Sequence, residues 1–245
     1  MPFKTILVYL SSKARAEHLM RAAVPLARRS NAHLIGLYVL PPPVIASDLG
    51  MSYGAQIVTL DRSALEKEAE EIRKLFEAST KGETLVAEWR LVDSLEPDTV
   101  RTVIEHARAS DIVVVSQSDS STDPSPLIDA PERLTLESGR PVLIVPHTGR
   151  FDHIGERVLV AWNNRREASR AVFDALPLLE QARDVRVLWI NPQKDGVEPE
   201  QLPTAEIAAA LSRHGVKATA AYSVARDIDA GNEILSRAAD EGADL

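Results

Sequence analysis

The chain has 245 residues, which corresponds to one large domain or two small ones, and its 44% apolar and 26% charged residues are ordinary for a globular protein. The 28 basic residues against 36 acidic ones give a net charge of −8, which disfavours binding to nucleic acid or to an anionic membrane. The absence of cysteine excludes disulfides, thiolate metal sites and cysteine nucleophiles. No signal-peptide pattern and no membrane-length apolar run is present, so we expect a cytoplasmic protein.

Strands and helices alternate along the first half. The apolar pattern predicts strands at residues 6–10, 33–40, 85–92, 112–115 and 142–145. Helical spacing of apolar residues predicts helices at 16–28, 63–76 and 97–107 between them. Such alternation is typical of a parallel sheet with helices on both faces, joined by right-handed crossovers.

The second half repeats the start of the first. Residues 158–162 (VLVAW) follow residues 6–10 (ILVYL) by 152 positions, and the same offset places 175–179 (ALPLL) on 23–27 (AVPLA). Further elements are expected as strands at 184–191 and 216–224 and as helices at 205–214 and around 234–238. The chain is therefore predicted to hold two tandem α/β domains, with the boundary in residues 147–156.

The offset between the halves falls to 132 further along, where Val103 aligns with Leu235. About 20 residues are therefore present in the first half alone. We place most of them in residues 41–54, because consecutive prolines and glycines neither continue a strand nor open a helix.

Three segments resemble a universal stress protein domain: the opening strand, the AVPLA segment and the closing residues 140–146 (RPVLIVP). Residues 158–171 (VLVAWNNRREASRA) resemble the start of that family even more closely. The resemblance implies a tandem member with domains at 1–148 and 154–245. It also implies two open parallel-sheet sandwiches of the adenine-nucleotide-hydrolase-like type, with strand order 3-2-1-4-5.

The second copy is expected to be incomplete at its C-terminus. Residues 242–245 match residues 110–112, so the chain stops where a fourth strand would begin. We expect the natural protein to continue with the glycine-rich phosphate loop of the family.

A ligand in such a sheet binds beyond the carboxyl ends of the strands where the strand order reverses, here between the first and fourth strands. The family has an Asp and a glycine-rich loop at these two places. The first half has Ser11 and a loop without glycine, in which Asp119, Asp123 and two prolines should repel a triphosphate. We expect no ATP binding there in the family manner. The residues Ser11, Ser116 and Gln117 line either a solvated loop or a pocket for a neutral or cationic small molecule.

The second half has Asn163 and Asn164 where the family has Asp-Gly. An asparagine can offer a donor and an acceptor to an adenine edge or a ribose hydroxyl. Equally, Asn163 can cap the helix that starts near Arg166. The resemblance implies ATP or AMP as the ligand of this half, and the candidate residues are Ala161, Asn163, Asn164 and Ile190.

The resemblance implies a stress-response regulator that is not an enzyme. The alternative is a non-nucleotide small-molecule or protein-interaction module that uses residues 41–60 and the Ser11 pocket. The six histidines lack metal-ligand spacing, so no metal site is expected. Because single-domain relatives pair through the fifth strand, we expect residues 142–145 to make that pairing within the chain as a pseudo-dimer. A homodimer of the whole chain is left open.

Overall fold

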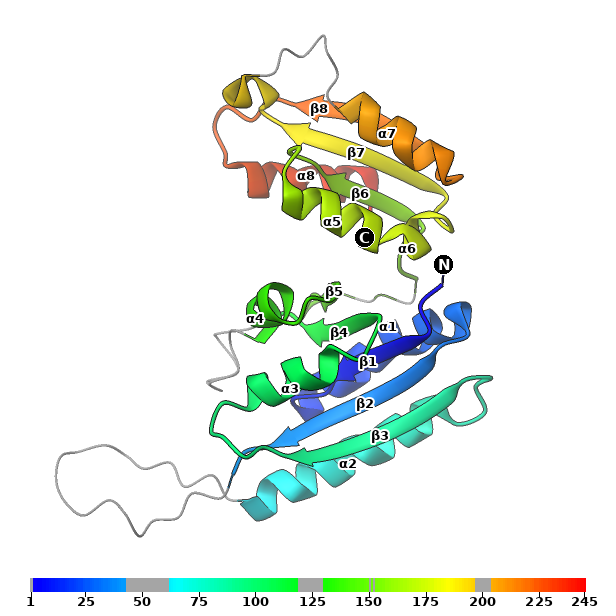
Figure 1. Ribbon diagram of the computed structural model, residues 1–245, viewed down its shortest axis with the longest axis vertical. Helices are drawn as coiled ribbons and strands as arrows, with labels where there is room; N and C mark the ends of the chain where they lie inside the picture. Colours follow the sequence, from blue (N-terminus) through cyan, green and yellow to red (C-terminus); the bar gives the residue numbers. More distant parts are fainter. Residues whose placement is uncertain (1, 43–61, 119–129, 150, 152, 197–203) are drawn as a thin grey trace, which may run out of the picture. The chain divides into compact units, whose positions relative to one another are not determined.

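The computed structural model describes residues 2–42, 62–118, 130–149, 151, 153–196 and 204–245. The chain divides into two compact units, a first unit at Pro2–Arg150 and a second unit at Phe151–Leu245. Each unit has its own parallel β-sheet, covered by helices (Figure 1). No helix within the described ranges is long and apolar enough to cross a membrane.

The first unit is a parallel sheet of five strands in the order β3-β2-β1-β4-β5, which confirms the expected strand order. In the register of this sheet, Ile6 lies between Leu34 and Ile112. The strand order reverses between β1 and β4, as the sequence predicts. The elements are β1 (Thr5–Tyr9), α1 (Lys13–Ser30), β2 (His33–Leu40), α2 (Arg62–Thr80), β3 (Val86–Asp93), α3 (Thr99–Ala107), β4 (Ile112–Ser116), α4 (Ala130–Glu137) and β5 (Val142–Val145).

Burial explains the composition of these strands. The central strands β1 and β4 are covered on both faces and consist almost wholly of buried Ile, Leu and Val. The edge strand β3 is more polar, and Glu88 and Arg90 pair on it at 2.6 Å. His33 of β2 lies 3.3 Å from the same Glu88 carboxylate. The β3 edge of the first sheet is therefore charged.

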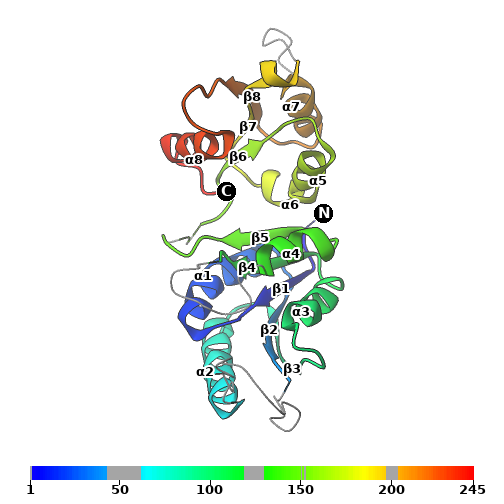
Figure 2. The same ribbon diagram turned by 90° about the vertical axis from the view of Figure 1, so that its left-hand side faces the viewer.

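The helices of the first unit form two layers. Figure 2 shows α1 and α2 on one face of the sheet and α3 and α4 on the other. On the α2 face, Phe76 packs over Gly36, where an added Cβ would lie 2.7 Å from the Phe76 ring and 3.1 Å from Trp89. A glycine is therefore required in the middle of β2. The core toward α3 and α4 contains Leu7, Leu37, Val103, Val113 and Leu134.

The second unit has three described strands in the order β6-β7-β8, again parallel. Figure 2 shows α5 and α7 on one face of this sheet and α8 on the other. The core on the α5 and α7 face includes Val160, Trp162, Val172, Trp189 and Leu211. The elements are β6 (Arg157–Ala161), α5 (Arg166–Asp174), α6 (Leu176–Leu179), β7 (Asp184–Ile190), the 3-10 turn η2 (Pro192–Asp195), α7 (Thr204–Arg213), β8 (Ala218–Ser223) and α8 (Ala230–Glu241).

The two units share their strand arrangement. Thr5 pairs with His33 across β1 and β2, and Arg157 pairs with Asp184 across β6 and β7. After α8, the Asp244 N–H donates to the Arg157 carbonyl (2.9 Å), just as the Asp111 N–H donates to the Thr5 carbonyl (2.9 Å). The residues after α8 therefore enter the second sheet where β4 enters the first.

Part of the length difference between the two halves lies in a helix. Helix α2 has 19 residues and its counterpart α7 has 10, so nine of the roughly 20 extra residues lie in this helix. Residues 43–61, which include most of the segment 41–54, lie outside the described residues. The expectation that most of the extra residues fall in 41–54 therefore stays a prediction.

Candidate functional site

Two serines, Ser11 and Ser12, follow β1 at the carboxyl edge of the first sheet. The Leu10 N–H donates to the Leu37 carbonyl (2.9 Å), so Ser11 is the first residue beyond the β1 ladder. Ser12 is the N-cap residue of α1 and has an extended backbone, but its side chain makes no capping hydrogen bond. Both serines are half-buried. The start of α1 is therefore capped by some other group.

That group is a carboxylate of α2. Glu68 Oε1 accepts a hydrogen bond from the Lys13 N–H (2.8 Å), and Glu71 Oε2 lies 2.7 Å from Lys13 Nζ. Tyr38, which is 3% exposed near the end of β2, lies beside Glu68 as well. Burial and the negative charge of Glu68 raise the pKa of Tyr38 to about 12. The position that an anion would take at the start of α1 is thus filled by the protein's own carboxylates.

Gln117 follows β4 and is fixed to the end of β5. Its Oε1 lies 3.1 Å from His147 Nδ1 and 3.4 Å from the His147 backbone nitrogen. Arg15 of α1 in turn donates to the His147 carbonyl (3.1 Å). The Ser116 hydroxyl donates to the Gln117 carbonyl (3.2 Å). The side chains of Ser116 and Gln117 are therefore already engaged in local hydrogen bonds.

The pairing of Val8 with Val114 brings Ser11 to the same sheet edge as Ser116 and Gln117. The three predicted residues of the first half are therefore neighbours along this edge. The loop that contains Asp119 and Asp123 lies outside the described residues.

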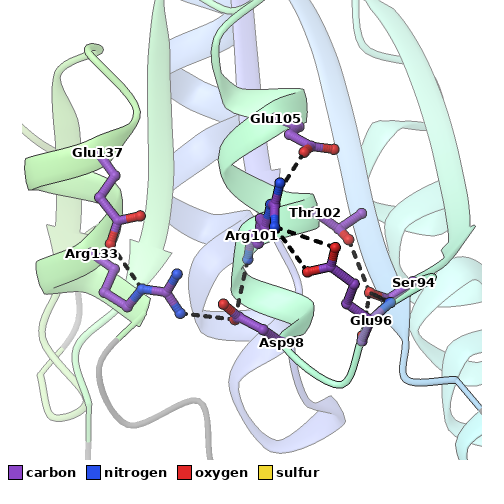
Figure 3. Close-up of polar contacts among 8 residues, drawn as sticks. All are labelled: Ser94, Glu96, Asp98, Arg101, Thr102, Glu105, Arg133 and Glu137. Atoms are coloured by element: carbon purple, nitrogen blue, oxygen red, sulfur yellow. Dashed lines mark hydrogen bonds and ion pairs between the residues drawn. The ribbon is translucent and has the colours of Figure 1, made fainter.

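A polar network beyond β3 joins α3 to α4 (Figure 3). Asp98 is the N-cap residue of α3, and its carboxylate accepts hydrogen bonds from the Arg101 N–H (3.4 Å) and from Arg133 of α4 (2.8 Å). Arg133 also pairs with Glu137 at 2.9 Å. The Arg133 hydrogen bond is the main cause that lowers the pKa of Asp98. This ion pair fixes the first turn of α4 against the first turn of α3.

The second sheet ends differently from the first. The Trp162 N–H donates to the Leu188 carbonyl (2.9 Å), so Trp162 takes the place that Leu10 has after β1. Asn163 Oδ1 accepts from the Arg165 N–H (3.1 Å), and Asn164 has a left-handed backbone with a φ of 55°. The N-cap residue of α5 is Arg165. Asn163 therefore forms a turn before the helix and is not its N-cap.

The other predicted residues of the second half lie at the ends of β6 and β7. Ala161 is exposed and Ile190 is half-buried. The next residue, Asn191, is buried and also has a positive φ of 53°. Its Oδ1 accepts from the Ala225 N–H (2.8 Å), and its N–H donates to the Ser223 carbonyl (2.8 Å). Asn191 thereby holds the ends of β7 and β8 together.

The sequence analysis missed Glu68, Tyr38, Trp162 and Asn191. The internal repeat contains the information for one of them, because it aligns Leu10 with Trp162, whereas Asn191 is expected as the last residue of the strand 184–191 and follows β7 instead. The contact between Glu68 and Lys13 leaves no mark in the sequence, since 55 residues separate the two.

The starts of α1 and α5 differ in charge. At α1, two carboxylates surround Lys13. At α5, Arg165 and Arg166 are exposed, and the Arg166 side chain is 92% exposed and lies 3.0 Å from Glu167. Among the described residues, no side chain of another helix caps the first turn of α5. A positive helix start with two arginines favours an anion.

The part of the chain that the structure describes holds no group of three or more His, Asp or Glu side chains placed to bind a metal ion.

The fold has solved counterparts. A universal stress protein from Archaeoglobus fulgidus DSM 4304 is 15% identical, with a TM-score of 0.67 over 98% of this chain and 82% of that chain. A putative universal stress protein from Pseudomonas aeruginosa UCBPP-PA14 is 16% identical, with a TM-score of 0.55 over 98% of this chain and 80% of that chain. No curated protein matches the sequence. The universal stress protein family matches residues 2–146, more than half of the chain, and the chain therefore belongs to that family.

Proposed function

We propose that this chain is a non-catalytic regulator of the stress response that binds an adenine nucleotide, ATP or AMP, at the carboxyl edge of the second sheet. In this proposal the first unit does not bind the nucleotide. The observation that carries it is the contrast between Lys13, whose N–H and ammonium are taken by Glu68 and Glu71, and the exposed Arg165 and Arg166.

The residues at the carboxyl edge of the second sheet suit a nucleotide. Asn163 and Asn164 follow β6 and carry both donors and acceptors, which suit a ribose or a base edge. Arg165 and Arg166 are placed at the start of α5, where their charges and the helix dipole act in the same direction on a phosphate. Base and phosphate would thus be held by neighbouring residues of one turn.

One polar pair near the carboxyl edge of the second sheet, Ser223 and Glu233, is not arranged as a nucleophile and its base. The Ser223 hydroxyl donates to Glu233 Oε1 (2.6 Å), and Arg237 lies 2.8 Å from the same oxygen. The hydrogen bond from Ser223, together with Arg237, lowers the pKa of Glu233. Glu233 is therefore a weak base that could not activate the serine as a nucleophile.

Isothermal titration calorimetry of the full chain with ATP and with AMP tests the proposal. We expect one site per chain and at least a tenfold weaker affinity in the Arg165→Ala/Arg166→Ala variant, because both phosphate contacts are lost. Arg170→Ala is the matched control, since Arg170 lies on the same helix and pairs with Asp174 at 3.3 Å. No heat at millimolar nucleotide, or two equal sites per chain, would contradict the proposal.

The second candidate function is a non-nucleotide small-molecule module in the first unit. The two negative charges of Glu68 and Glu71 exceed the single positive charge of Lys13 next to Ser11. This excess of negative charge favours a neutral or cationic ligand. Thermal unfolding with and without spermidine tests it. Stabilisation that Glu71→Gln removes and Glu77→Gln preserves would support this function, and an unchanged melting temperature would reject it.

A further inference from the structure

Trp162 has an indole N–H without a partner. The residue is 8% exposed, and its buried Nε1 has no hydrogen-bond partner among the described residues. The other such atom in the described ranges is His33 Nε2, which still lies 3.3 Å from the Glu88 carboxylate. Buried tryptophan N–H groups normally find an acceptor. The unpaired indole therefore needs an explanation.

Packing does not require this N–H group. Trp162 occupies the place of Leu10, which is wholly buried and wholly apolar, and both residues donate their backbone N–H to the neighbouring strand. An apolar side chain therefore serves the fold at this position. At the adjacent position, Tyr38 of the first unit lies beside Glu68, and its counterpart in register is Trp189.

The unpaired Trp162 N–H group lies at the carboxyl edge of the second sheet, which is the proposed nucleotide site. Trp162 directly precedes Asn163 and Asn164, and its side chain belongs to the apolar cluster that contains Trp189 and Val172. An apolar wall with one directed donor suits a flat heterocycle that carries a ring nitrogen as acceptor. The exposed Arg165 and Arg166 suit the phosphate instead.

We propose that the Trp162 indole N–H is a specificity-determining donor that binds an acceptor on the base of the ligand. This inference rests on the proposed function, because it assigns the base end of the same site. The indole nitrogen is covered in the ligand-free chain, so entry of the base displaces a neighbouring side chain. The bound base then supplies the acceptor that the described residues lack.

The Trp162→Phe variant tests this role, since it keeps an aromatic ring and removes the N–H. Full-length protein is titrated calorimetrically with AMP, adenosine and ribose 5-phosphate, with Trp89→Phe in the first unit as the matched control. We expect affinity for AMP and adenosine to fall about tenfold in Trp162→Phe alone, with ribose 5-phosphate unaffected.

The indole N–H resonances of the ¹⁵N-labelled wild-type protein give a second measurement, which does not depend on the folding of the variant. The Trp162 indole resonance should shift when adenosine is added, and the Trp89 resonance should not. If the wild type binds AMP but the Trp162 resonance stays in place, or if Trp162→Phe binds AMP equally well, the inference is wrong and the proposed function stands. If the wild type binds no adenine nucleotide, both are wrong.

Discussion

Asp111 and Asp244 hold equivalent places in the two units and act in the same way. The Asp111 carboxylate accepts hydrogen bonds from the backbone N–H groups of Lys4 (2.7 Å) and Thr5 (2.9 Å) at the start of β1. The Asp244 carboxylate accepts from Gly155, Glu156 and Arg157 (3.0, 3.1 and 3.0 Å) at the start of β6. A carboxylate thus tethers the opening strand in each unit.

Asp111→Ala should weaken the attachment of β1. Hydrogen bonds to a charged group contribute about 1.5–3 kcal/mol, so we expect a loss of about 2 kcal/mol in the opening free energy of β1. Native-state hydrogen exchange of the β1 amides measures this loss in the full chain. Glu105→Ala, which removes an exposed carboxylate on α3, should leave those amides unchanged. Equal exchange rates in the two variants would show that the tether contributes nothing.

Gly36→Ala should destabilise the first unit, because the new methyl group would lie 2.7 Å from the Phe76 ring. Overpacking of this kind typically costs about 1–3 kcal/mol. Thermal unfolding should show a lower melting temperature for Gly36→Ala. The Gly36→Ala/Phe76→Leu variant should lose less stability than the sum of the two single changes, since the smaller side chain leaves room for the methyl. Strict additivity would argue against the steric explanation.

Glu68→Gln should lower the pKa of Tyr38 from its value of about 12, because the negative charge beside the phenol is removed while its burial remains. A raised pKa means that the folded chain holds the phenol proton more tightly than the unfolded chain. Its stabilising contribution is therefore complete below pH 10 and is lost as the pH rises toward 12. Tyrosinate absorbance against pH measures the shift, with Tyr38→Phe identifying the transition. An unmoved transition would mean that burial alone sets the pKa.

Asp98→Asn should lower the stability of the protein at neutral pH and leave it unchanged in acid. The lowered pKa of Asp98 means that the folded state favours the carboxylate, so the stabilising contribution is present above the ordinary value of 3.8. That contribution is lost as the pH falls through the lowered pKa. Urea midpoints of the wild type and Asp98→Asn should therefore differ at pH 7 and converge at lower pH. Asp227→Asn, at an exposed carboxylate, is the control, and a difference that persists in acid would contradict the ion-pair explanation.

Local pattern and the resemblance to the family predict the sheet of the first unit correctly. Strands such as residues 112–115 consist of consecutive β-branched residues, and such a run is typical of a buried strand. The boundaries of the helices follow less directly. The pattern predicts a helix at 63–76, whereas α2 extends to Thr80. The packing of Phe76 over Gly36 is a contact between distant segments, which a local pattern does not contain.

The candidate site is less predictable than the fold. The sequence places Ser11, Gln117 and Asn163 at sheet edges, because strand ends can be read from apolar runs. It does not indicate that Glu68 caps α1, since a cap from another helix has no fixed spacing. The orphan indole of Trp162 is likewise invisible in the sequence, because a missing acceptor is a property of the folded surroundings.

The charged edge of the first sheet has a consequence for self-association. β3 is an edge strand, and such strands can recruit a strand from another molecule and start aggregates. A strand added beside β3 would have to accommodate the paired Glu88 and Arg90 side chains next to His33. Charged side chains at such a position disfavour pairing with a strand of a second molecule.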